Sequence, residues 1–177
     1  MLLVAGAWFL CGCASSARVQ TDFNPSADFS SFGSFSFISD KPLLVATIGI
    51  SPLLEGRLIN ATRRELTSKG YRFVANRETA DIVVSFTMGA RDKIKVTSYP
   101  VNYRGYNQWR WGTGYYEQVD VRNYTEGTLS IDIFDVKRRS PVWHGWAVKT
   151  ISSQDRRNPT PVINEIVAAM FADFPER

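Results

Sequence analysis

The residues best suited to chemistry in this sequence are one histidine and two aspartates. His144 is the only histidine, and Asp132 and Asp135 lie in the apolar run that precedes it. A histidine beside a carboxylate can act as a general base, and a serine added to that pair completes a hydrolase triad. The chain contains no Gly-x-Ser-x-Gly elbow. A hydrolase that uses Asp132 or Asp135 with His144 therefore remains an alternative and not the main interpretation.

Strand alternation favours a structural role for the histidine. In an extended segment His144 shares a face with Val142, Trp146 and Val148. We therefore interpret it as a packed or half-exposed imidazole and expect no enzymatic activity. No His-x-x-His, Cys-x-x-Cys or glycine-rich phosphate loop is present, so we expect no metal and no cofactor. The net charge of +4 is scattered along the chain, which argues against a nucleic-acid partner.

Cys13 is the third residue type with a specific chemistry. An apolar run from Leu2 to Leu10 leads into Cys11-Gly12-Cys13, and it is far shorter than the ~20 residues that a helix needs to cross a bilayer. Leu10, Gly12 and Cys13 resemble the lipobox of bacterial lipoproteins, in which the cysteine sulfur carries the lipid. No Lys or Arg precedes the run, whereas a signal peptide normally begins with a basic segment, so we expect a start upstream or a trimmed chain.

An aromatic segment is the remaining unusual feature. Seven of the 18 residues from Tyr99 to Tyr116 are aromatic, against 13% for the whole chain. Glycines at 105, 112 and 114 favour a long loop or the end of an extended hairpin. Such rings either cover the open face of a sheet or form a binding surface. The candidate binding residues are Tyr103, Tyr106, Trp109, Trp111, Tyr115 and Tyr116.

These residues must be positioned by a small mixed domain. Residues 52–69 and a segment that opens at Thr160-Pro161 have helical apolar stripes, and 137–140 reads as a hairpin turn. Strands are expected at 34–37, half-buried by its alternation, and at 71–74, 81–87, 93–99, 117–124, 127–136 and 141–150. We predict a two-layer α+β fold: one mostly antiparallel sheet of six or seven strands, with two helices packed on one face.

The domain boundaries follow from the same reading. Residues 1–12 are expected to be a signal peptide, 13–31 a lipidated tether and 32–177 a single domain of ordinary size.

Short motifs lie along the chain at 22–30, 80–85, 124–135, 142–147 and the closing Phe174-Pro175. Together they resemble the domain-of-unknown-function 4136 family of bacterial lipoproteins. The resemblance implies an envelope lipoprotein with a compact α+β fold and no assigned activity. His144 departs from the arginine expected at its position, and only Cys13 carries over, as the lipid-bearing residue. Residue 14 is Ala and not the aspartate that retains lipoproteins in the inner membrane, so the resemblance implies residence in the outer membrane.

The combined interpretation is a lipid-anchored envelope protein. We expect membrane attachment through Cys13 and, as partner, another envelope protein or peptidoglycan. The expected role is a non-catalytic binding or structural module at the periplasmic face of the outer membrane.

Overall fold

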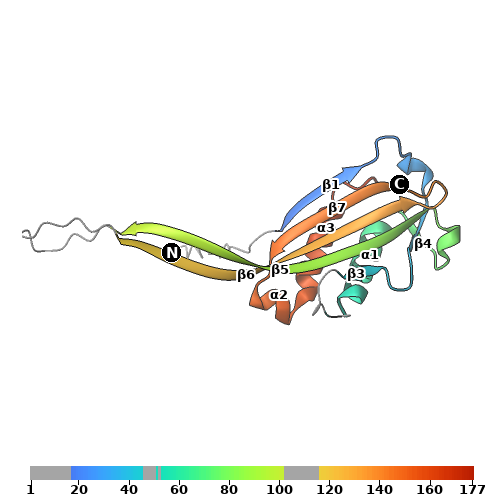
Figure 1. The fold of residues 1–177 in the computed structure, drawn as a ribbon. Helices are drawn as coiled ribbons and strands as arrows, with labels where there is room; N and C mark the ends of the chain where they lie inside the picture. The colour runs from blue at the N-terminus through green and yellow to red at the C-terminus, as the bar shows by residue number, and fades with distance from the viewer. Residues whose placement is uncertain (1–16, 46–50, 52, 102–115) are drawn as a thin grey trace, which may run out of the picture.

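The protein is a mixed sheet with helices on one face (Figure 1). A computed structural model describes residues 17–45, 51, 53–101 and 116–177. In these ranges the seven strands pair in the order β1-β7-β6-β5-β2-β4, and β3 pairs with β5. Their bounds are β1 Arg18–Phe23, β2 Ser34–Phe37, β3 Leu43–Val45, β4 Arg72–Phe73, β5 Ile82–Val101, β6 Tyr116–Asp135 and β7 Ser140–Thr150. Pairing is antiparallel among β1, β7, β6 and β5 and parallel for β2 and β3 against β5 and for β2 against β4.

Two long helices form the second layer. They are α1, Leu53–Ser68, and α3, Pro159–Phe171, and the short α2, Ser153–Arg157, precedes α3. Arg57 hydrogen-bonds Thr160 at the start of both helices, and Lys69 hydrogen-bonds the Ala172 carbonyl at their ends. The two helices therefore run parallel, with both N-termini at the same end of the sheet. The expected α+β architecture is confirmed.

The core lies between this helix pair and the sheet. The predicted stripe of α1 is buried at Leu58, Thr62 and Leu66 and partly buried at Leu54 and Ile59. The predicted stripe of α3 is buried at Ile163, Ile166, Val167, Met170 and Phe171. The sheet contributes alternate residues of its central strands, among them Ile82, Val84, Phe86, Ile131 and Ile133. All of these are buried, as a period of two against a covered face requires.

In two places, a pair of expected strands forms one continuous strand. The expected 81–87 and 93–99 are both parts of β5, and 117–124 and 127–136 are both parts of β6. β7 ends at Thr150, opposite Glu126, so β5 and β6 continue beyond it as a two-stranded ribbon. We call residues 91–101 and 116–125 the arm. At ~3.4 Å per residue it extends about 35 Å from the body (Figure 1).

Three further differences from the expected fold have local causes. The sheet begins before residue 32, because Arg18–Phe23 pairs with β7 as an edge strand within the expected tether. All four residues of β2 are buried, so it is not half-buried. A bulge at Ile133/Phe134 shifts the register of β7, and Val142 joins the core instead of sharing a face with His144.

Candidate functional site

His144 and Asp132 meet on the sheet face opposite the helices. The pairing of β6 with β7 places them directly across from each other, and His144 Nδ1 lies 2.6 Å from Asp132 Oδ1. The histidine side chain is 46% exposed and the aspartate 27%. The imidazole is therefore half-exposed, as the sequence predicts, and the carboxylate orients its ring.

The arrangement around this pair is not that of a hydrolase triad. Ser130 Oγ is 3.1 Å from Asp132 Oδ2 and 3.5 Å from His144 Nδ1. A triad needs the serine at Nε2, with the carboxylate alone at Nδ1. Here both approach the same nitrogen, Nδ1, so Ser130 is not placed to give its proton to Nε2.

Asp135, the second predicted carboxylate, belongs to the β6–β7 turn. It is 3% exposed, and its carboxylate accepts the Arg138 backbone N–H at 2.9 Å and pairs with the Arg138 guanidinium at 3.3 Å. This fixes the turn at 136–139, where Arg139 has a φ of 52°. The structure does not bring Asp135 to His144. Within the described ranges, no three His, Cys, Asp or Glu side chains cluster as a metal site would require.

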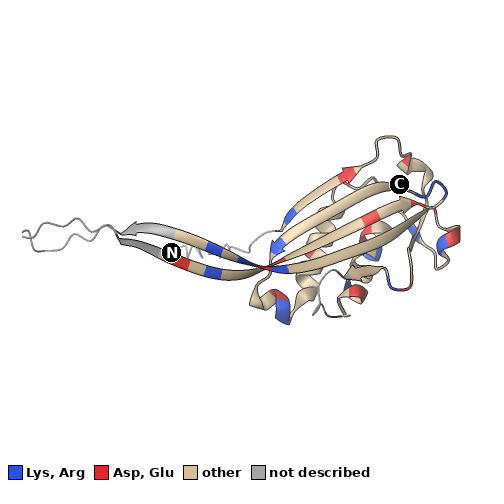
Figure 2. Ribbon diagram, viewed as in Figure 1, with Lys and Arg blue, Asp and Glu red and all other residues tan. Residues whose placement is uncertain are grey.

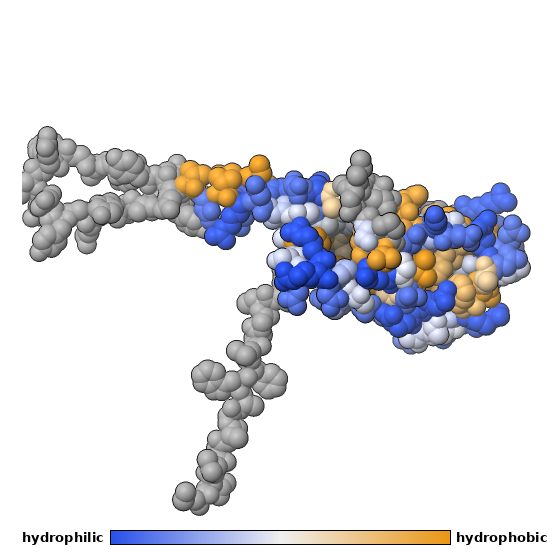
Figure 3. Space-filling model, turned by 90° about the horizontal axis from the view of Figure 1, so that it is seen from below, coloured by the Kyte–Doolittle hydropathy of each residue, from blue (hydrophilic) through white to orange (hydrophobic). Residues whose placement is uncertain are grey.

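One face of the arm consists of exposed apolar side chains. Ile94, Val96, Val119 and Val121 are 54–67% exposed, and Val96 pairs directly with Val121. Strand alternation places all four on one face, which continues the face that packs against the helices in the body. Figure 3 shows hydrophobic side chains gathered along one side of the arm. In the described part of the arm, nothing covers this surface.

The opposite face of the arm is charged. Lys93 and Lys95 on β5 alternate with the apolar residues, and Arg122 and Asp120 on β6 form an ion pair at 2.8 Å. Figure 2 shows charged positions along the strands of the arm. The arm is thus an amphipathic ribbon. This pattern is typical of a strand pair with one face against a partner and one in water.

Ion pairs to one buried carboxylate join the two strands at the root of the arm. Glu126 is 5% exposed, and its carboxylate binds Lys93 Nζ at 2.7 Å and Arg91 Nη2 at 3.1 Å. The hydrogen bond from Lys93 is the main reason that the pKa of Glu126 lies below its usual value, with Arg91 adding to it. The cluster joins β5 and β6 where the ribbon leaves the sheet.

The predicted aromatic binding residues fall largely outside the described part of the chain. Tyr103, Tyr106, Trp109, Trp111 and Tyr115 belong to residues 102–115, which connect β5 to β6, and Tyr116 is the first residue of β6. Cys13 also lies outside the described residues. The alternation of Ile94 and Val96 with lysines indicates an edge or one-sided strand, but the aliphatic face of the arm was not among the predicted sites.

The Val-Trp-His-Gly stretch has a packing role. The indole of Trp143 stacks on Phe171 with ring centroids 5.0 Å apart and lies across Gly145, where a Cβ would come within 2.4 Å of the ring. Only glycine leaves room for that indole.

Asp81 also has a structural role. Its carboxylate accepts hydrogen bonds from the backbone N–H groups of Gly33 and Ser34 at 2.9 and 2.8 Å.

In the described ranges, the helices are all too short or too polar to span a membrane.

No curated protein matches this sequence. Several solved structures share its fold, among them the following two. A DUF4136 family protein from Bacteroides thetaiotaomicron is 17% identical with a TM-score of 0.59, over 88% of this chain and 94% of that one. A PelC dodecamer from Paraburkholderia phytofirmans is 14% identical with a TM-score of 0.53, over 92% and 99%.

At these identities the two likenesses show the fold alone. The family is shown by the match of residues 19–176 to the model of the domain of unknown function DUF4136. That match spans all the described strands and helices except Arg18, the first residue of β1, and it confirms the family resemblance read from the sequence. The chain therefore belongs to the DUF4136 family.

Proposed function

We propose that this protein is a lipid-anchored lipoprotein of the bacterial envelope, at the periplasmic face of the outer membrane, and that it binds another envelope protein through the arm. The observation that carries the binding role is the exposed apolar face formed by Ile94, Val96, Val119 and Val121. Burying these side chains against a complementary surface removes them from water, which is favourable by ~25 cal/mol per Å² of apolar surface buried. The anchor rests on the Leu10-to-Cys13 pattern.

A protein partner fits this surface better than peptidoglycan. The described apolar face is made of branched aliphatic side chains, whereas a glycan presents hydroxyl groups that need hydrogen-bond donors and acceptors. The charged face supplies Lys93 and Lys95 away from the apolar contact, which keeps the free arm soluble. A structural relative, PelC, is found as a dodecamer, so a second copy of this chain is one form that the partner can take.

Photo-crosslinking tests the arm directly. A photoreactive amino acid at Val121 should give a discrete crosslinked band in intact cells, whereas one at Lys137 in the distant β6–β7 turn should not. Ile94→Asp should weaken the Val121 crosslink without changing the melting temperature, because residue 94 lies outside the core. Crosslinks to glycan fragments, or none at either position, would contradict a protein partner. The mass of the band separates a copy of this chain from another protein.

The anchor is tested separately. Cys13→Ser should abolish incorporation of labelled palmitate and release the protein from the membrane fraction, because two or more acyl chains are what hold a lipoprotein stably. Cys11→Ser is the matched control and should keep both properties. Equal membrane association of the two variants would rule out Cys13 as the anchor.

A second candidate function is a periplasmic hydrolase. The 2.6 Å bond between His144 and Asp132 favours it, since a carboxylate orients the imidazole in many hydrolases. Its nucleophile would have to be something other than Ser130, for the geometric reason given above. Retention of the cellular phenotype in a His144→Ala variant would exclude it.

A further inference from the structure

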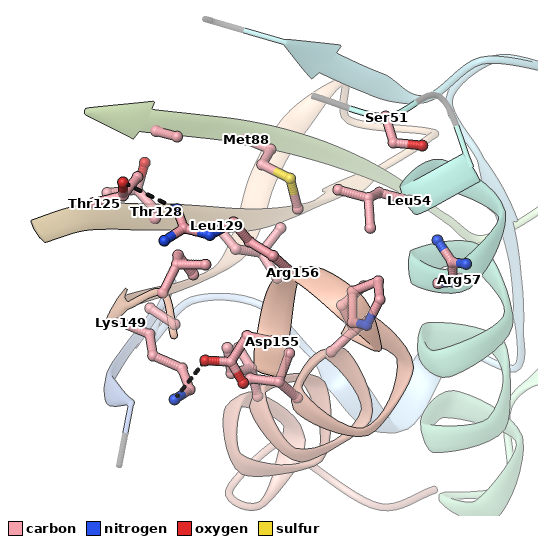
Figure 4. A pocket seen from close by; sticks show the side chains of 18 of the residues that line it. Ser51, Leu54, Arg57, Met88, Thr125, Thr128, Leu129, Lys149, Asp155 and Arg156 are labelled. Carbon is pink, nitrogen blue, oxygen red and sulfur yellow. Dashed lines mark hydrogen bonds and ion pairs between the residues drawn. The ribbon is translucent and has the colours of Figure 1, made fainter. Parts of the chain in front are cut away.

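A cavity opens between the helices and the sheet at the end of the body from which the arm extends (Figure 4). Its volume is about 480 Å³, within the range of ~300–1,000 Å³ typical of small-molecule sites. Leu54 from α1 and Met88 from β5 point toward one another across it, and Leu129 of β6 lies in its wall. The helix layer adds Val162, Ile163 and Ile166.

On β5 and β6, the side chains that face the helices become smaller at the cavity. Met88, Leu129 and Ala147 form one row across three strands, and Ala90, Gly127 and Lys149 form the next row on the same face. Gly127 has no side chain, and the Ile151 side chain lies where its Cβ would be, at 2.9 Å. Ala90 and Gly127 thus present less side-chain volume to the helices than Met88 and Leu129 do, and Ile151 and Lys149 line the cavity beside them.

The rim of the cavity is cationic. Arg57, Lys149, Arg156 and Arg157 all line it, whereas Asp155 is the only acid that does so among the described residues. Asp155 is already engaged by Lys149 at 3.3 Å and by the N–H and hydroxyl of Ser152. Arg156 and Arg157 are exposed on α2, and Arg156 also donates to Thr125 Oγ1 at 3.2 Å. The rim therefore carries net positive charge around an apolar interior.

We propose that this cavity binds one alkyl chain of an amphiphile with an anionic head group. The chain would lie among Leu54, Met88, Leu129 and Ile163, and the head group would meet Arg156 and Arg157. Apolar burial supplies the affinity and the guanidinium groups supply the preference for carboxylate or phosphate. This proposal does not depend on the binding role proposed for the arm or on the protein's location.

One source of such a chain is the protein itself. β1 starts at Arg18, which pairs with Val148 between the cavity residues Ala147 and Lys149. Cys13 is five residues earlier, within about 18 Å of Arg18 even for a fully extended chain. An acyl group on Cys13 is therefore one possible occupant, and a free fatty acid or lysophospholipid is the other.

Fluorescence of 11-(dansylamino)undecanoic acid tests the cavity in the full-length Cys13→Ser chain, in buffer without detergent. We expect a saturable increase in emission that decanoate reverses and decyltrimethylammonium does not. Across saturated C8, C9 and C10 carboxylates, competition should strengthen about fourfold per methylene, the fold-change that corresponds to ~0.8 kcal/mol. No saturable signal, or equal competition by the cationic amphiphile, would overturn the proposal.

Two variants locate the binding. Arg156→Glu combined with Arg157→Glu should raise the Kd of the probe at least tenfold, whereas Lys137→Glu, an exposed charge reversal at the opposite end of the sheet, should change it less than twofold. Ala147→Phe should abolish binding by filling the cavity. Because Ala147 is buried, that variant can also fail to fold, and the exposed rim variant then keeps the test decisive. Equal affinity in the rim variant and the Lys137→Glu control would refute the site.

The source of the chain is then separated with the lipidated wild type in nanodiscs. If the acyl chain on Cys13 fills the cavity, the wild type should not bind the probe although Cys13→Ser does. Equal binding by both assigns the site to a free amphiphile. This last comparison rests on the proposed lipidation, and the binding measurements on Cys13→Ser do not.

Discussion

Adding one methyl group at Gly145 should destabilise the protein measurably. A Cβ at this position would lie 2.4 Å from Trp143 Cη2 and 3.0 Å from two further ring carbons. Since favourable carbon contacts start at ~3.5 Å, the indole must move by about 1 Å. It has little freedom to do so, because Trp143 is 3% exposed and packs against Phe171 and Phe174 with centroids 5.0 and 5.4 Å away.

Overpacking of this kind costs about 1–3 kcal/mol, which for a domain of this size lowers the melting temperature by about 2–4 °C per kcal/mol. We expect Gly145→Ala to lie near the middle of that range, about 2 kcal/mol and 4–8 °C. Calorimetry and urea unfolding both measure this loss. Gly56→Ala is the matched control, since its Cβ would meet nothing within 4 Å on α1, and it should stabilise the protein by about 0.5–1 kcal/mol.

The clash can be isolated by a double-mutant cycle. Trp143→Leu removes the ring that the new methyl meets, so Gly145→Ala should cost little in that background, with a coupling free energy above about 1 kcal/mol. If the two substitutions are additive, or if Gly145→Ala alone leaves stability unchanged, the packing explanation for Gly145 is wrong.

Three further predictions concern single side chains. Asp81→Asn should lower the free energy of unfolding by about 1–2 kcal/mol at neutral pH, because it weakens the three hydrogen bonds that Gly33 and Ser34 donate to the carboxylate. Burial raises the pKa of Asp81, but the hydrogen bonds from Ser34 and Gly33 outweigh it and hold the pKa below its usual value. The stabilisation is therefore complete above the pKa of ~3.9 in the unfolded chain and disappears as the pH falls through the lower pKa in the folded protein. The free energy of unfolding should consequently fall more steeply with decreasing pH in the wild type than in Asp81→Asn. Glu126→Gln should increase hydrogen exchange of the arm amides at 91–97 with little change in melting temperature, whereas Asp120→Asn, at an exposed ion pair, should leave exchange at 91–97 unchanged. His144→Ala should change the free energy of unfolding by less than about 1 kcal/mol in thermal melts, because the imidazole is half-exposed; a loss above 2 kcal/mol would contradict this.

The helix layer could be predicted because its signals are local. The α3 stripe repeats with a helical period, and residues 163, 166, 167, 170 and 171 are buried as that period requires. The short α2 was missed, although Ser152 and Asp155 have the spacing of a capping box and form one in the structure.

The extent of the strands could not be predicted, because it depends on distant partners. Gly89, Arg91 and Asp92 look like the end of a strand in the sequence. β6 supplies a backbone partner for all of them, and Glu126 neutralises Arg91. Ser34 likewise suggests a solvent-facing position, yet it is buried because its hydroxyl donates to Asp81, 47 residues away.

The candidate sites show the same limit. Alternation left His144 either packed or half-exposed, and the structure shows it half-exposed beside Asp132 of the adjacent strand. The cavity draws residues from α1, β5, β6, β7, α2 and α3, so no local pattern reveals it. The apolar face of the arm became visible only when the register joined Val96 to Val121.

The placement of β1 has a mechanical consequence. This strand is held at the edge of the sheet through β7 along six residue pairs, from Arg18 to Phe23. A force applied at residue 17 along the strand axis loads these hydrogen bonds together in shear, whereas a force perpendicular to the axis peels them apart one after another. For a domain tethered through its N-terminus, the resistance to being torn loose therefore depends on the direction of pull. Single-molecule stretching along the two axes should give a higher rupture force for shear.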